Sequence, residues 1–164
     1  MRTARLAAVA AVLAVPAIAQ AQSATISATA TVVTALTVTG NASLAFGNVY
    51  QGVAKTVVAT DAASGRLAVA GFQNAQVALT FTLPNNLTSG GNNLPIDSWD
   101  VRTNGTNVTT GATALTVVSG TPVNANLVSG NLFLFVGGRV QPAAAQVAGS
   151  YSGTITLAAA YTGL

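Results

Sequence analysis

The sequence contains no cysteine and no histidine, and it has only six Lys or Arg and three Asp or Glu among 164 residues. Without cysteine the chain forms no disulfide, so packing and strand pairing must hold it together. Without thiol or imidazole it lacks the commonest general base, nucleophile and soft metal ligands. We therefore expect a protein that is not an enzyme and that binds no cofactor and no transition metal.

Long apolar runs are also missing. The uncharged stretch near the N-terminus, residues 6–19, contains Pro16. It is shorter than the roughly 20 apolar residues that a helix needs to cross a bilayer. Two arginines precede this stretch, and two small-x-small cleavage motifs follow, which end at Ala19 and Ala21. These are the parts of a secretory signal peptide. We predict that residues 1–21 are removed, with cleavage after Ala21 or, as a second choice, Ala19, and that the protein is secreted and has no membrane span.

Removal of the signal peptide takes two arginines with it. Four basic side chains then face three acidic ones, and no basic stripe remains to neutralise phosphates. We therefore expect no nucleic-acid partner. A surface with so little charge also lacks the repulsion that keeps protein molecules apart, which favours association.

The remaining composition is typical of β-strands, because Thr and Val are abundant and Glu is absent. Apolar and polar residues alternate over residues 77–83 and 151–162, and an apolar run at 132–136 is flanked by glycines. Turn signals such as Gly40-Asn41 and Gly137-Gly138 separate the runs. This pattern predicts an all-β sandwich. Its predicted core consists of Leu44, Phe46, Val77, Leu79, Phe81, Leu132, Leu134, Ile155 and Leu157.

One alternating segment, residues 24–38, is unusually long. Fully extended it would span about 50 Å, against about 17–20 Å for an ordinary strand. The alternation falters at residues 32–34, which suggests a joint. We predict a donor-strand arm at 22–32 and a sandwich domain at 33–164, whose first strand covers 34–39. The arm residues expected to contact a neighbouring subunit are Ala24, Ile26, Ala28, Ala30 and Val32.

The alternative is that the whole segment forms one long strand, which bends between the two sheets of its own domain. In both interpretations the apolar positions, two residues apart, share one face of the strand. The two differ in where that face is buried: in a second molecule, or in the same one.

Few other residues could carry chemistry. Asp97 and Asp100 are close in sequence, but positions i and i+3 of a strand face opposite sides, which argues against a glycosidase pair. With Asn104 they could ligate calcium; otherwise they lie in a turn with Arg102 as a surface partner. Trp99 could be a sugar-stacking platform or a core residue.

Two short motifs resemble a known family. Leu44, Phe46 and Gly47 form an L-x-F-G element, and residues 149–156 followed by Tyr161 form a G-x-Y-x-G-T-x-T strand with a late tyrosine. Both resemble elements of small secreted bacterial domains related to spore-coat-protein-U-like proteins, which are similar to archaic chaperone–usher pilins. The resemblance spans essentially the whole chain after the signal peptide. The chain departs from many such pilins in having no cysteine for a disulfide.

The resemblance implies an incomplete immunoglobulin-like, pilin-like sandwich that the N-terminal arm of the next subunit completes. It also implies a periplasmic chaperone and an outer-membrane usher as assembly partners. Strand addition between identical subunits is head-to-tail, so it generates an open polymer. We therefore expect a structural subunit of an extracellular filament or pilus at the cell surface, with a role in cell adhesion.

The alternative is a monomeric secreted adhesin or carbohydrate-binding module. Such a module needs an exposed aromatic cluster, and the candidate residues for it are Tyr50, Trp99 and Tyr151. Filaments of the native protein would favour the first expectation, and a monomer would favour the second.

Overall fold

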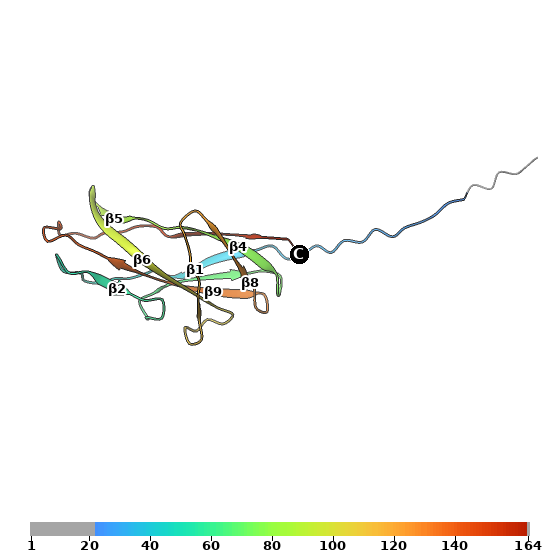
Figure 1. The fold of residues 1–164 in the computed structure, drawn as a ribbon, viewed down its shortest axis with the longest axis horizontal. Coiled ribbons are helices and arrows are strands. Elements are labelled where there is room, and N and C mark those ends of the chain that lie inside the picture. Colours follow the sequence, from blue (N-terminus) through green and yellow to red (C-terminus); the bar gives the residue numbers. More distant parts are fainter. Residues whose placement is uncertain (1–21, 164) are drawn as a thin grey trace, which may run out of the picture. The chain divides into compact units, whose positions relative to one another are not determined.

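The protein is described by a computed structural model that covers residues 22–163, and all its regular elements are strands (Figure 1). The strands are β1 (Thr37–Ala42), β2 (Lys55–Val57), β3 (Gly65–Ala70), β4 (Gln76–Thr82), β5 (Asn86–Ser89), β6 (Asn92–Asn104), β7 (Thr113–Ala114), β8 (Pro122–Asn126), β9 (Asn131–Val140) and β10 (Thr156–Tyr161). No helix occurs in residues 22–163, so none there could span a membrane. The all-β prediction is confirmed. The predicted signal peptide lies outside the described residues.

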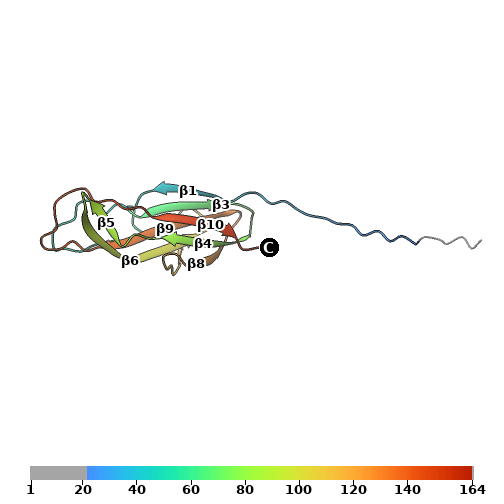
Figure 2. The same cartoon turned by 90° about the horizontal axis from the view of Figure 1, so that it is seen from above.

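The strands form two antiparallel sheets. The larger has the order β1-β3-β9-β6-β5, with β2 paired to β9 and β7 paired to β6, and the smaller has the order β10-β4-β8 (Figures 1 and 2). Leu79 and Phe81 of β4 are fully buried against Val69 of β3 and Leu134 of β9. The core therefore lies between the sheets, as in a β-sandwich.

The predicted core is correct for six of its nine residues. The buried ones are Val77, Leu79, Phe81, Leu132, Leu134 and Leu157. Leu44, Phe46 and Ile155 are only half-buried. They lie just outside β1 and β10, and they line an open cleft instead of the closed interior. For these three the prediction of full burial is wrong.

Gly137 and Gly138 do not form the predicted turn, because β9 runs through them to Val140. A Cβ atom on Gly137 would lie 2.7 Å from the backbone nitrogen of Ala59 and closer still to the carbonyl oxygen of Val57. A Cβ on Gly138 would lie 3.3 Å from the Trp99 ring. These glycines therefore mark a close approach of other chain segments to a central strand, which is the second common reason for glycine in a sheet.

The first strand begins at Thr37, three residues later than predicted, and it includes Gly40, which was predicted to be in a turn. The register between β1 and β3 shifts there, as in a β-bulge. Residues 22–36 have no regular secondary structure and join neither sheet. The described chain from Val32 onward forms one compact unit, and residues 22–31 do not belong to it.

The last strand is shorter than the alternation over residues 151–162 predicts, since β10 starts only at Thr156. Before it, Ser152 exchanges two backbone hydrogen bonds with Thr88 of β5, at 2.8 and 3.0 Å. Residues 146–155 line the cleft, and no strand lies there to extend the ladder. Residues 151–155 therefore have the alternation of a strand, but no neighbouring strand in the described chain pairs with them.

Candidate functional site

Each sheet has an open edge on the same side of the sandwich. Within the described residues β1 pairs only with β3, and β10 pairs only with β4. At one end the two edges are held together, because the Tyr161 hydroxyl donates to the carbonyl oxygen of Thr34 at 2.8 Å and accepts from the backbone nitrogen of Phe72 at 2.7 Å. Away from this end the edges separate.

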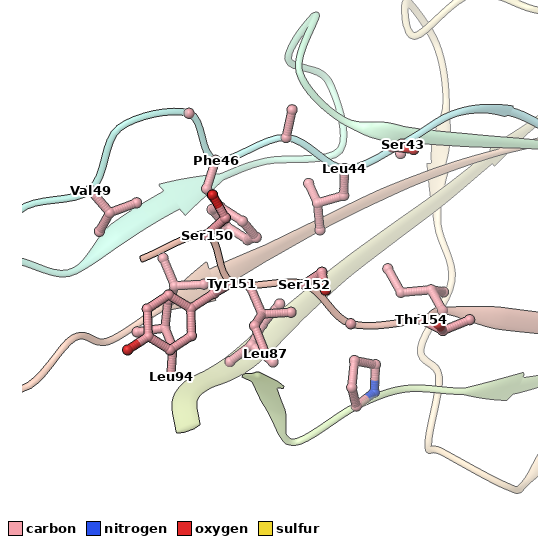
Figure 3. Close-up of a pocket in the computed structure, with 18 of the residues that line it drawn as sticks. Ser43, Leu44, Phe46, Val49, Leu87, Leu94, Ser150, Tyr151, Ser152 and Thr154 are labelled. Carbon is pink, nitrogen blue, oxygen red and sulfur yellow. The ribbon is translucent and has the colours of Figure 1, made fainter. Parts of the chain in front are cut away.

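Between the chain that follows β1 and the chain that leads into β10 lies a cleft of about 1270 Å³. Its rims are two continuous segments, residues 40–51 and residues 146–155. Leu44 and Phe46 point from the first rim toward the second, and Leu87 and Leu94 lie beneath them (Figure 3). The cleft is thus a long channel with an apolar floor.

The floor is a second hydrophobic cluster, separate from the main core. Leu94, Ile96 and Val140 are buried at its base. The side chains packed over them are only partly buried: Leu44, Phe46, Val49, Leu87, Trp99 and Tyr151. A contiguous apolar surface that stays open to solvent is typical of a binding site.

The backbone of both rims has little pairing of its own. On the first rim the backbone nitrogen of Ala45 donates to the carbonyl oxygen of Ala63 at 2.9 Å. On the second rim, among residues 147–155 of the described chain, Ser152 alone exchanges backbone hydrogen bonds with another segment. Backbone donors and acceptors left unpaired along a groove can pair with an added strand.

The cleft carries almost no charge. Arg66 is its single charged lining residue, and the Arg66 guanidinium carbon lies 5.7 Å from the centre of the Phe135 ring, as in a cation–π contact. The lining is therefore suited to an uncharged, extended, apolar segment.

The sequence-predicted arm residues are all exposed in the described chain. They are Ala24, Ile26, Ala28, Ala30 and Val32, and the exposed fractions of Ile26 and Val32 are both 96%. The predicted arm, residues 22–32, contains no charged residue. A side chain as apolar as isoleucine gains about 1.5–3 kcal/mol when it is fully buried, so the arm has apolar surface left to bury.

The two aspartates belong to β6 and not to a turn, so that prediction is wrong. A bulge with a positive φ of 49° at Ser98 separates them. Asp97 accepts hydrogen bonds from Arg139 Nε at 3.0 Å and from a terminal nitrogen of that guanidinium at 3.1 Å. Asp100 accepts one from the backbone nitrogen of Ala59 at 2.9 Å and pairs with Arg102 at 3.3 Å.

The calcium alternative is not supported by this geometry. The side chain of Asn104 is directed to the carbonyl oxygens of Val108 and Thr110, at 2.9 and 3.1 Å, and not to the aspartates. Among residues 22–163 no three His, Cys, Asp or Glu side chains gather as a metal site.

The Asp97–Arg139 pair gives a prediction on pH. The hydrogen bond from the Arg139 guanidinium holds the pKa of Asp97 below its ordinary value of 3.8. Because the folded pKa is the lower one, the pair's contribution to stability is present above about pH 4 and is lost as the pH falls through the folded pKa. In an NMR titration, Arg139→Met should raise the pKa of Asp97. Arg102→Met, which removes the partner of Asp100, should leave the titration of Asp97 unchanged.

The three aromatic candidates all line the cleft. Trp99 is half-buried and packs on both hydrophobic clusters, in line with a core role. The Tyr151 hydroxyl donates to the carbonyl oxygen of Val147 and accepts from Gln146 Nε2, each at 2.7 Å. Tyr50 alone is strongly exposed, at 75%. They do not form one exposed stacking surface.

Sequence reasoning did not predict the cleft. It singled out the arm by its length, but it placed Leu44, Phe46 and Ile155 in a closed core. Residues 43–47 and 149–155, which belong to the two motifs that carried the family resemblance, lie on the two rims, and so these motifs were the signal for the cleft. No known family model matches the chain. No curated protein is significantly similar to it in sequence either, so the geometry carries the functional inference.

Proposed function

We propose that the protein is a structural subunit of an extracellular filament or pilus, which polymerises when the arm of one subunit enters the cleft of the next. The observation that carries the proposal is the cleft itself, whose two rims have largely unpaired backbone above an apolar floor. An added strand would pair its backbone with both edges and bury its apolar face below.

The arm and the cleft are complementary in three respects. Residues 22–31 are similar in length to the rims at 40–51 and 146–155. Both partners are uncharged apart from Arg66. The arm presents apolar residues at every second position, and in an extended strand these share the face that would meet the floor.

The strand order also supports the proposal. In an immunoglobulin-like sandwich the sheets have the orders A-B-E-D and C-F-G. In this proposal β1-β3-β9-β6 of the larger sheet would take the places of A-B-E-D. In the smaller sheet, β10-β4-β8, strands β4 and β10 would take the places of C and F, so a missing strand G would lie beside β10. An inserted arm would take that place and complete the sandwich.

The proposal also includes export of the chain and the partners that assemble it. The predicted signal peptide exports the chain, and an unfilled cleft would expose apolar surface until a subunit arrives. A periplasmic chaperone that covers the cleft and an outer-membrane usher that exchanges it for an arm are therefore part of the proposal. Catalysis is not, because the cleft lining offers no nucleophile–base pair.

The test compares the mature chain with a variant that lacks residues 22–31, viewed by negative-stain electron microscopy. We expect filaments from the complete chain and monomers from the truncated one, because the truncated chain keeps its cleft but has no arm. Addition of a peptide of residues 22–32 should raise the melting temperature of the truncated chain, and a peptide with Asp at position 26 should not. Filaments from the truncated chain would rule the proposal out.

A carbohydrate-binding adhesin is the second candidate, and the observation that favours it is that Tyr50, Trp99 and Tyr151 all line the cleft. Its expected properties differ from those of a filament subunit. The chain would stay monomeric at high concentration, and titration calorimetry would detect an oligosaccharide that the cleft binds.

A further inference from the structure

A short segment, residues 33–36, connects the arm to β1 and is anchored on the domain. We refer to it as the joint. Val33 and Tyr161 line the same small hollow, which has a volume of about 240 Å³. The Tyr161 hydroxyl donates to the carbonyl oxygen of Thr34 at 2.8 Å. Leu36 packs against the main core. Three contacts therefore hold the joint, and Tyr161 takes part in two of them.

The Tyr161 hydroxyl connects the joint to both sheets. Tyr161 is the last residue of β10, and its hydroxyl also accepts from the backbone nitrogen of Phe72, just after β3, at 2.7 Å. The fit is close. A Cβ atom on Gly71 would lie 2.7 Å from a methyl carbon of Leu36 and nearer still to the Tyr161 hydroxyl oxygen. The position of the joint is thus set by a single buttressed hydroxyl group.

The joint lies on the far side of β1 from the subunit's own cleft. β1 follows the joint directly and leads into the first rim, which begins at Gly40. The strand runs away from the end of the domain where β10 ends (Figure 2). None of residues 33–39, all of them within the described chain, lines the cleft. The arm is therefore attached at the opposite end of β1 from the cleft.

An anchored joint limits how far the arm can turn back. Two antiparallel segments advance equally per residue, so a chain that reverses at Val32 brings Gln22 level with Ala42, each ten residues from the turn. The arm would then reach only the start of the first rim. If the joint were released and the chain reversed at Ala35, Gln22 would come level with Asn48, and the arm would lie along most of that rim.

Without such a limit, an arm would favour its own cleft over that of a neighbour. An arm tethered by a few flexible residues has an effective concentration of the order of millimolar at a site within its reach. A second subunit competes only at its bulk concentration, which is far lower in a dilute solution. A head-to-tail polymer therefore requires a feature that keeps the arm out of its own cleft.

We propose that Tyr161 is this feature and that it determines the partner of the arm. Its hydroxyl anchors the joint, so the arm does not turn back into its own cleft and is left for a second copy of this chain. The inference rests on the proposed function, because it takes the cleft as the site that receives the arm. Tyr161 does not line the cleft, so it acts by positioning the joint.

Tyr161→Phe tests the proposal, because it keeps the ring and removes both hydrogen bonds of the hydroxyl. The critical concentration for polymerisation should rise by about tenfold or more, since monomers would fill their own clefts. The matched control is Thr37→Val. It removes a bond from Thr37 Oγ1 to the carbonyl oxygen of Ala70, 3.4 Å long, at the same end of the domain but outside the joint. This variant should polymerise as the unmodified chain does.

Two further measurements separate self-insertion from damage to the fold. A peptide of residues 22–32 should bind the chain without residues 22–31 equally well with Tyr or Phe at position 161. In dilute monomers of the complete chain, spin labels at Ser23→Cys and Val53→Cys should come within roughly 20 Å of each other only when Phe replaces Tyr161, because residue 23 would then lie level with Gly47. Val53 is exposed and lies outside the cleft lining, and the chain has no cysteine of its own.

The outcomes distinguish this inference from the proposed function. If Tyr161→Phe polymerised at the same concentration as the unmodified chain, or if its monomers lacked the short distance, Tyr161 would not determine the partner and strand insertion would stand. Loss of peptide binding in the truncated Tyr161→Phe chain would trace the effect to the cleft, which also contradicts the inference. A peptide that binds neither truncated chain would overturn strand insertion itself, and this inference with it.

Discussion

Ile26→Asp is expected to abolish filament formation at concentrations where the unmodified chain polymerises. Ile26 is 96% exposed in the free chain, and it is the largest apolar side chain in residues 22–31. Its burial in the cleft of a neighbour would contribute about 1.5–3 kcal/mol, which corresponds to roughly ten- to a hundredfold in affinity. An aspartate there would lose this contribution and would also place an unpaired charge on an apolar floor, a further cost of several kcal/mol.

The matched control is Thr29→Asp. It adds the same charge three residues away, and in an extended strand positions 26 and 29 face opposite sides. Its effect on assembly should be much smaller, because its face of the inserted strand would be solvated. The measurement is the critical concentration for polymerisation, by light scattering and electron microscopy. Equal effects of the two variants would mean that the arm does not insert with the proposed face inward.

Gly137→Ala is expected to destabilise the domain by roughly 3 kcal/mol or more, near the upper end of what single substitutions do. The added methyl group would meet the carbonyl oxygen of Val57 and the backbone nitrogen of Ala59. Both are backbone atoms, which cannot move aside as a flexible side chain can. Gly137 lies in β9, which pairs with β2, β3 and β6, so a shift there disturbs much of the larger sheet.

Gly40→Ala is the corresponding control in a strand. A Cβ on Gly40 would have no neighbour within 4 Å, and its φ is not positive. The substitution should change stability by no more than about 1 kcal/mol, in the stabilising direction, because alanine has less freedom in the unfolded chain. Thermal unfolding followed by circular dichroism measures both variants. If the Gly137→Ala and Gly40→Ala variants had the same melting temperature, the backbone near Gly137 would have room for a Cβ atom and the prediction would be wrong.

The strands that the sequence predicts well are those with local signals. Alternation over residues 77–83 gives β4 because one face of that strand is fully buried between the sheets. The apolar run at 132–136 gives the middle of β9 for the same reason. In both segments the pattern of side chains within a few residues is enough, since the burial follows the pleat.

The errors arise where distant segments decide the outcome. Nothing local distinguishes Gly137 in a strand from a glycine in a turn, because the reason for it is the backbone at Val57, far away in sequence. The sequence also placed Asp97 and Asp100 in a turn, although both lie in β6. The reason is that the bulge at Ser98 interrupts the alternation between them.

The cleft was not predicted for the same reason, because it forms between segments that are distant in sequence. Its rims at 40–51 and 146–155 are about a hundred residues apart. From sequence, Leu44 and Phe46 of the first rim were predicted to be core residues, and residues 151–155 of the second were predicted to be part of a strand. Only the spatial arrangement reveals that no strand lies between them. The arm could be singled out from sequence because its unusual property, an alternation longer than a strand, is local.

The position of Trp99 provides an optical reporter. It is the only tryptophan in the chain, it lines the cleft, and its ring packs beside Gly138 at the base of that cleft. Its indole emission depends on the polarity of its surroundings, so the fluorescence spectrum of the unlabelled protein reports whether the cleft is filled with water or with a ligand. Occupancy can therefore be followed in real time by stopped flow, without a dye and without a change in sequence.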